Sequence, residues 1–174
     1  MQRADLEHIL RASSDITGAT EFIVIGSQAI LGQFPDAPPT LTVSREVDIY
    51  STRSPNDAVE IDASIGQGSL FDDTHGYFAH GVGEETAILP AGWKDRLVRV
   101  QTPSTGRAVG WCLEVHDLAV SKLIAGREHD VEFVGELLRH GLADRAIVRQ
   151  RLSGAPLDGE RLLSCEARLD RIPG

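Results

Sequence analysis

The sequence has few of the residues and motifs that mark several large protein classes. It contains two cysteines, and aromatic residues make up 5% of its 174 positions. Cys112 and Cys165 lie far apart in a chain with no evident export signal, so we expect two reduced thiols rather than a disulfide framework. Apolar runs such as "FIVIG" are much shorter than the roughly 20 residues that cross a bilayer. We therefore expect a soluble, cytoplasmic protein without a membrane anchor.

Common nucleotide and zinc motifs are also missing. The sequence has neither GxGxxG nor GxxxxGK, so nothing indicates a dinucleotide site or a P-loop. In "HGYFAH", His75 and His80 are five residues apart, which places them on opposite faces of a strand, and no cysteine pair is near. Ser27 lacks the histidine and aspartate pattern of a nucleophile. A net charge of −9 argues against a broad electrostatic contact with nucleic acid, although a local basic cluster could still hold phosphates.

The apolar content, 41%, is sufficient for the core of one domain. Hydrophobic periodicity predicts an α/β (α+β) fold, in which the strands resemble an antiparallel sheet and further helices follow at the C-terminus. We expect a core over 1–115 and a helical part over 116–174, packed together as one compact unit. The expected helices are 3–13, 27–34, 54–66, 116–140, 143–151 and 159–170, and the expected strands are 21–26, 42–51, 76–82, 84–90, 95–102 and 107–115.

The strand expected at 42–51 carries two acids on one face. Glu46 and Asp48 point one way while Val43, Val47 and Ile49 point the other. Two neighbouring carboxylates repel each other unless a cation lies between them. Magnesium uses one or two carboxylates, and phosphates and water complete its coordination, so a nucleoside triphosphate with magnesium fits this pattern. The alternative is an ordinary half-exposed strand whose acids meet water.

A Gly-Ser corner precedes this strand in the sequence "VIGSQAILG". Gly26 permits close approach of a phosphate to the backbone, and Ser27 is expected to cap the helix that follows. Free amides at a helix start favour an anion. Gly-Ser turns are also common without any ligand.

The helix expected at 116–140 turns three charged residues toward its apolar stripe: Lys122, Arg127 and Asp130. Buried charges must pair, line a cleft or meet a charged ligand. Gly126, in mid-helix, suggests that another group passes close by. We interpret Lys122 and Arg127 as neutralising phosphate charge while Asp130 positions the lysine. An ion pair that only orients the helix remains the alternative.

Four segments, "VIGSQAILG", "SREVDIY", "LPAGWKDRLV" and "LEVHDLAVSKLIAGREHDVEFV", resemble nucleotidyltransferase-fold proteins of the abortive-infection and toxin–antitoxin type. Together they cover most of residues 21–140. The resemblance implies a nucleotidyltransferase-like mixed or antiparallel sheet flanked by helices. By position it also implies that Gly26 and Ser27 hold phosphates, that Glu46 and Asp48 hold magnesium, and that Lys122 and Asp130 complete the site.

The resemblance further implies magnesium-dependent transfer of a nucleoside monophosphate from a triphosphate to a hydroxyl of RNA, protein or a small molecule. The usual Asp-x-Asp is Glu-x-Asp here, and the segment between Ser27 and Glu46 is longer than the commonest spacing. A third carboxylate is open between Asp62, Glu85 and Glu114. These departures support a second hypothesis, a catalytically degenerate domain that acts as a binding or antitoxin-like module.

Overall fold

The computed structural model describes residues 1–173 and contains one five-stranded mixed sheet, with the strand order β3-β2-β1-β5-β4. The central strand β1 is antiparallel to β2 and parallel to β5. At the edges, β3 is parallel to β2 and β4 is antiparallel to β5. The prediction of a mixed sheet flanked by helices is confirmed. The strands are β1 (Glu21–Ile25), β2 (Glu46–Ser51), β3 (Phe78–Gly81), β4 (Val98–Val100) and β5 (Val109–Cys112).

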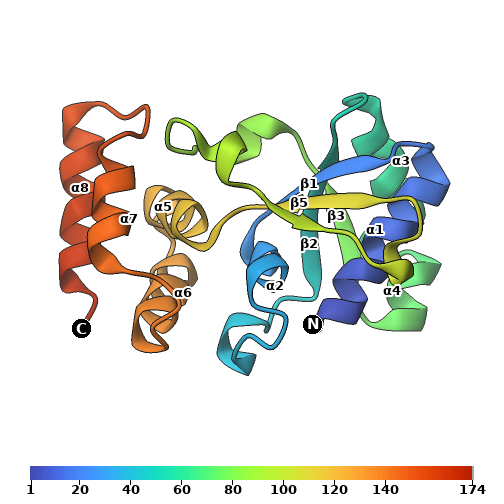
Figure 1. Ribbon diagram of the computed structural model, residues 1–174, viewed down its shortest axis with the longest axis horizontal. Helices are drawn as coiled ribbons and strands as arrows, with labels where there is room; N and C mark the ends of the chain where they lie inside the picture. The colour runs from blue at the N-terminus through green and yellow to red at the C-terminus, as the bar shows by residue number, and fades with distance from the viewer. Residues whose placement is uncertain (174) are drawn as a thin grey trace.

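Apart from α2, which lies beside the middle of the sheet, the helices form two groups on either side of the strands (Figure 1). Helices α1, α3 and α4 gather at one end of the molecule, and α5 to α8 stack at the other. None of the helices within residues 1–173 is both long and apolar enough to cross a membrane. The helices are α1 (Arg3–Thr17), α2 (Ile30–Gln33), α3 (Asn56–Ile65), α4 (Leu70–His75), α5 (Val115–Ala125), α6 (Glu128–Arg139), α7 (Arg145–Leu152) and α8 (Gly159–Arg171).

The core lies between the sheet and the helices that cover it. In β1, the residues from Phe22 to Ile25 are all buried, as expected for a central strand with both faces covered. Helix α1 buries Leu6, Ile9 and Leu10 at helical spacing. A Cβ on Gly110 of β5 would lie 2.7 Å from Leu10 Cδ1, so a glycine is needed where the helix approaches the sheet.

Two expected strand assignments were wrong. Residues 84–90 form no strand but a 3-10 turn over Glu84–Thr86 followed by a segment without regular secondary structure. Strand β2 begins only at Glu46, so Val43 is 76% exposed instead of facing the core. Alternating apolar residues give a segment two faces, but a strand also needs a partner for its backbone, and the sequence does not identify that partner.

The single helix expected at 116–140 is two helices. Helix α5 ends at Gly126, which has a φ of +67° in the left-handed region, and α6 begins at Glu128. A Cβ on Gly126 would also lie 2.5 Å from Arg168 Cζ, and Arg168 Nη1 donates a hydrogen bond to the carbonyl of Leu123 at 2.8 Å. The glycine is therefore a C-cap against which α8 packs, rather than a residue in mid-helix.

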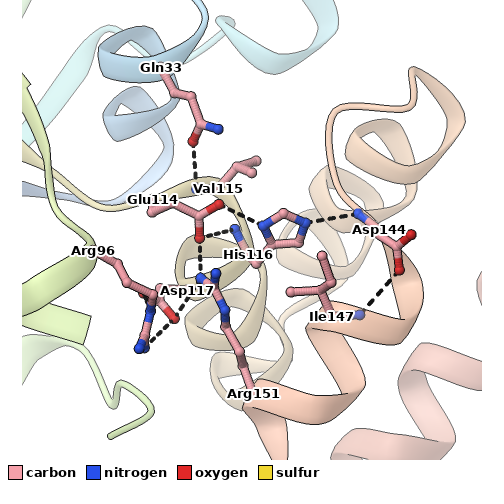
Figure 2. A network of polar contacts seen from close by, with 9 residues as sticks. All are labelled: Gln33, Arg96, Glu114, Val115, His116, Asp117, Asp144, Ile147 and Arg151. Atoms are coloured by element: carbon pink, nitrogen blue, oxygen red, sulfur yellow. Dashed lines mark hydrogen bonds and ion pairs between the residues drawn. The ribbon is translucent and has the colours of Figure 1, made fainter. Parts of the chain in front are cut away.

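A polar network joins α5 to α7 and to the segment before β4 (Figure 2). Asp117 is fully buried and accepts hydrogen bonds from Arg96 at 2.8 and 3.0 Å, and Arg151 of α7 lies 3.1 Å from it. Glu114 caps α5 by accepting the amide hydrogen of His116, and it also pairs with Arg151. Two buried or half-buried acids are thus matched by two arginines from other elements.

His116 extends this network to the start of α7. Its Nε2 accepts the Asp144 amide hydrogen at 3.0 Å, and its Nδ1 lies 2.6 Å from Glu114 Oε1. Because Nε2 accepts, the proton resides on Nδ1 and is donated to the carboxylate. The imidazole therefore links the start of α5 to that of α7.

Candidate functional site

Two acids and a histidine come together on one face of the sheet. Glu46 and Asp48 alternate along β2 with the fully buried Val47 and Ile49, so both carboxylates project to the same side. In the parallel pairing of β2 with β3, Asp48 is opposite His80. His80 Nδ1 lies 3.1 Å from Asp48 Oδ1 and 3.7 Å from Glu46 Oε1. One ligand atom from each of the three residues lies within 4.8 Å of the others.

Gly26 makes room for one of these carboxylates. It follows β1 with a φ of +70°, and a Cβ at this position would overlap Asp48 Oδ2. Strand register explains the contact, because Ile25 is opposite Asp48 in the antiparallel pairing of β1 with β2. A glycine is therefore required here by the Asp48 carboxylate, whereas the sequence indicated only the close approach of a phosphate.

The charges in this cluster are unbalanced. Burial and the nearby Asp48 raise the pKa of Glu46, and His80 and Lys122 act in the opposite direction. A divalent cation would relieve this repulsion. Two carboxylates suit hard cations such as Mg²⁺ or Mn²⁺, and the imidazole is a ligand that Mn²⁺ and Zn²⁺ accept more readily than Mg²⁺. The donor set therefore fits a divalent cation without identifying it.

The second half of the candidate site is an ion pair between α5 and α6. Lys122 Nζ donates to Asp130 Oδ1 at 2.8 Å, and Arg127 Nε donates to Asp130 Oδ2 at 2.7 Å. Burial raises the pKa of Asp130, but the two cations outweigh it and hold the pKa below its usual value. Lys122 and Asp130 are buried as expected, whereas the side chain of Arg127 is 66% exposed, so the inward orientation predicted for it was wrong.

A cavity of about 290 Å³ connects the two halves. The segment Thr86–Ile88, at the end of the 3-10 turn, forms part of its wall. Most of the residues named from the sequence meet here, although they come from segments more than 70 positions apart. The cavity is lined by Gly26 and Asp48 on the sheet side and by Lys122, Arg127, Asp130 and Arg161 on the helical side.

Two of the predicted residues are outside this lining. Ser27 borders another cavity, of about 790 Å³, together with Thr40 and Phe133. It is the first residue of a 3-10 turn, Ser27–Ala29, and caps no helix, so the expected N-cap was wrong. Glu46 belongs to the cluster of ligand atoms but not to the cavity wall.

Within residues 1–173, the cluster contains none of the three acids considered as a third carboxylate, which are Asp62, Glu85 and Glu114. Asp62 accepts the amide hydrogen of Gly81 at 2.7 Å, and Glu114 caps α5. The Glu85 carboxylate packs against Gly83 and faces a different cavity. The third group beside Glu46 and Asp48 is His80.

The sequence reading missed His80 and Arg161. His80 reaches the acids only through the pairing of β2 with β3. Its spacing from His75 does not reveal this pairing, and His75 lies in α4 rather than in a strand. Arg161 is brought to the cavity by α8, a surface helix with no motif. Both are placed by tertiary structure alone.

A family model described as "Nucleotidyltransferase of unknown function (DUF6036)" matches residues 4–155. The chain belongs to this family. The DUF6036 match covers the sheet, the cluster at Glu46 and the Lys122–Asp130 pair, and it ends before α8. No curated protein and no solved structure matches the chain.

Proposed function

We propose that this DUF6036 protein transfers a nucleoside monophosphate from a nucleoside triphosphate to an acceptor hydroxyl, with a divalent cation, Mg²⁺ in the first instance, held by Glu46, Asp48 and His80. The observation that supports this is the cavity in which Asp48 lies opposite Lys122, Arg127 and Asp130. An acidic side chain that can bind a cation and basic side chains that can bind phosphates then face each other across one small cavity. The family description is consistent with such an activity.

The roles of the residues follow from their contacts. Asp48 and Glu46, with His80, hold the cation, which offsets phosphate charge when bound. Lys122, oriented by Asp130, and Arg127 attract the phosphates on the other side. In the reaction the acceptor oxygen bonds to the α-phosphorus, and the bond from this phosphorus to the oxygen bridging to the β-phosphate breaks. Pyrophosphate leaves, and the hydroxyl proton passes to water.

A second candidate function is nucleotide binding without transfer. It is favoured by the lack of a third carboxylate in the cluster among residues 1–173. It is also favoured because Lys122 Nζ already pairs with Asp130 and lies 5.6 Å from the centre of the Phe133 ring. In that case the domain would act as a binding or antitoxin-like module.

One experiment separates these functions. The protein is incubated with α-labelled nucleoside triphosphates, Mg²⁺ or Mn²⁺, and total bacterial RNA. RNA is included because the resemblance to toxin–antitoxin proteins makes the end of a tRNA an acceptor worth testing. We expect label in RNA or in the protein itself with the wild type, and none with Asp48→Ala or Lys122→Ala. Asp73→Ala, an exposed acid on α4, is the matched control and should keep the activity.

The melting temperature completes the test. Transfer that persists in Asp48→Ala would contradict the proposed site. No transfer together with a rise in melting temperature on adding nucleotide and cation favours the binding module. The absence of both would exclude the two functions at this cavity.

A further inference from the structure

The sheet face that carries the acids continues into a second row of side chains. Asp48 lies opposite Ile25, and the next residue of β2 on that face, Tyr50, lies opposite Ile23. Ile23 in turn is opposite Trp111 of β5. Residues two apart in a strand point to the same side, about 7 Å from each other. A row of Tyr50, Ile23 and Trp111 therefore runs parallel to the row that contains Asp48, one step along the strands.

This second row is the floor of a cavity of about 820 Å³. Val82 and Leu97 add apolar walls. The segment after β3 lines both cavities: Glu84 and Glu85 line the large one, and Thr86 to Ile88 line the small one. The two cavities are therefore neighbours on one sheet face, and the volume of the larger is in the range of small-molecule sites.

One polar group in this floor has no partner. The Tyr50 side chain is 9% exposed, and its hydroxyl is buried without a hydrogen bond among residues 1–173. Burial, and after it the charges of Glu84 and Glu85, raise the pKa of Tyr50, so the hydroxyl stays protonated and able to donate. A ligand with an acceptor atom over this row would satisfy it.

Four charged side chains line this cavity, and ion pairs involve three of them: Arg53, Lys94 and Glu84, but not Glu85. Arg53 pairs with Asp57 at 2.6 Å, and Lys94 pairs with Glu84 at 2.7 Å. Because both cations are already paired and Glu85 adds a negative charge, the rim disfavours a phosphate and offers donors and acceptors to a neutral polar molecule. The floor includes two aromatic side chains, Tyr50 and the half-buried Trp111, and such a floor favours a ligand with a flat ring.

These features match a nucleoside. Its base is flat, its edge accepts hydrogen bonds, and its ribose hydroxyls are several ångström from the base. We propose that the large cavity binds the acceptor as a nucleoside, free or at the end of an RNA strand, with the base over Tyr50 and Trp111 and a ribose hydroxyl directed toward Asp48. The role of this nucleoside as the acceptor rests on the proposed function, but its binding can be tested without any transfer.

The test uses Trp111 as the reporter. The chain has two tryptophans, so Trp93→Phe leaves Trp111 as the only one. Adenosine is titrated without nucleotide or metal while tryptophan fluorescence is recorded, and calorimetry on the wild type gives a second measure. We expect saturable quenching by adenosine, and affinity weakened by up to about tenfold in Tyr50→Phe. Tyr77→Phe, the only other tyrosine and a residue outside this cavity, is the matched control and should bind as before.

Further arms fix the ligand class. A short single-stranded RNA that binds tighter than adenosine assigns the nucleoside to an RNA end, and the reverse assigns it to a free nucleoside. Binding by N-acetyltyrosinamide as tight as by adenosine would overturn the nucleoside in favour of a protein side chain, and no saturable binding of any probe would overturn the site. Adenosine binding is measured without nucleotide or metal. Wild-type protein that binds adenosine but transfers no label would therefore contradict only the proposed transfer, and protein that transfers label but does not bind adenosine would contradict only this inference.

Discussion

The carboxylate of Asp48 occupies the space that a side chain at Gly26 would fill. Strand pairing brings the two residues together, since Gly26 directly follows the residue opposite Asp48. The corner after β1 and the acid of β2 are therefore one structural unit, and a change in the first should be felt by the second.

Gly26→Ala should weaken cation binding as well as stability. Its φ of +70° with ψ of −176° is a region open essentially to glycine, so we expect a loss of about 1–3 kcal/mol in the free energy of unfolding. The displaced Asp48 carboxylate should also reduce the rise in melting temperature that Mn²⁺ produces in the wild type. Gly141→Ala, with a φ of +65° and nothing within 4 Å, is the control. It should lose stability but keep the response to Mn²⁺, and an unchanged response in Gly26→Ala would contradict the contact.

The Lys122–Asp130 pair should contribute more than an exposed pair. The two side chains are 11% and 0% exposed, so Lys122→Met leaves a buried carboxylate with two exposed partners, Arg127 at 2.7 Å and His129 at 3.7 Å. We expect a loss of about 3 kcal/mol in urea unfolding. The double variant Lys122→Met/Asp130→Leu should lose less than the sum of the single changes.

The matching pair for comparison is Arg149–Asp170 between α7 and α8, whose side chains are 42% and 61% exposed. A double-mutant cycle on it should give a coupling of about 0–1 kcal/mol. Equal coupling free energies for the two pairs would contradict the claim that burial makes the Lys122–Asp130 pair stronger than an exposed pair.

Glu114 should make stability depend on pH in the acid range. Burial raises the pKa of Glu114, but His116 and Arg151 outweigh it, so the pKa in the folded state is below 4.5. A lowered pKa means that the ionised group stabilises the fold above pH 4.5 and that this stability is lost as pH falls through the folded-state value. Glu114→Gln should therefore lower the melting temperature at pH 7 and flatten its decline below pH 4.5. Glu60→Gln, exposed on α3, should leave both unchanged.

Both thiols should be inert in the folded protein. Cys112 and Cys165 are free and buried, as the sequence predicted, and burial raises the pKa of Cys112 to about 12. At pH 8 a thiol reagent should label neither at a measurable rate in the native state, and both in urea. Rapid native labelling of Cys112 in a Cys165→Ser variant would show that α2 does not cover β5 as its contact through Gly32 requires.

Local patterns determined much of this protein. The buried strand at Phe22–Ile25, the acids alternating with Val47 and Ile49, and the helices after residue 143 follow from periodicity and could be predicted, because each depends on side chains close in sequence. The mixed sheet was within the predicted class. The sequence also indicated Lys122 and Asp130, since buried charges on an apolar stripe require partners.

Tertiary structure alone decided the rest. His80 meets Asp48 because β3 joins β2 in parallel register, and Arg161 reaches the cavity because α8 packs against the break at Gly126. The segment after β3 lines two cavities rather than forming a strand, because the pattern of a segment does not identify the partner that its backbone will find. Contacts between distant segments depend on packing, which no local window of the sequence contains.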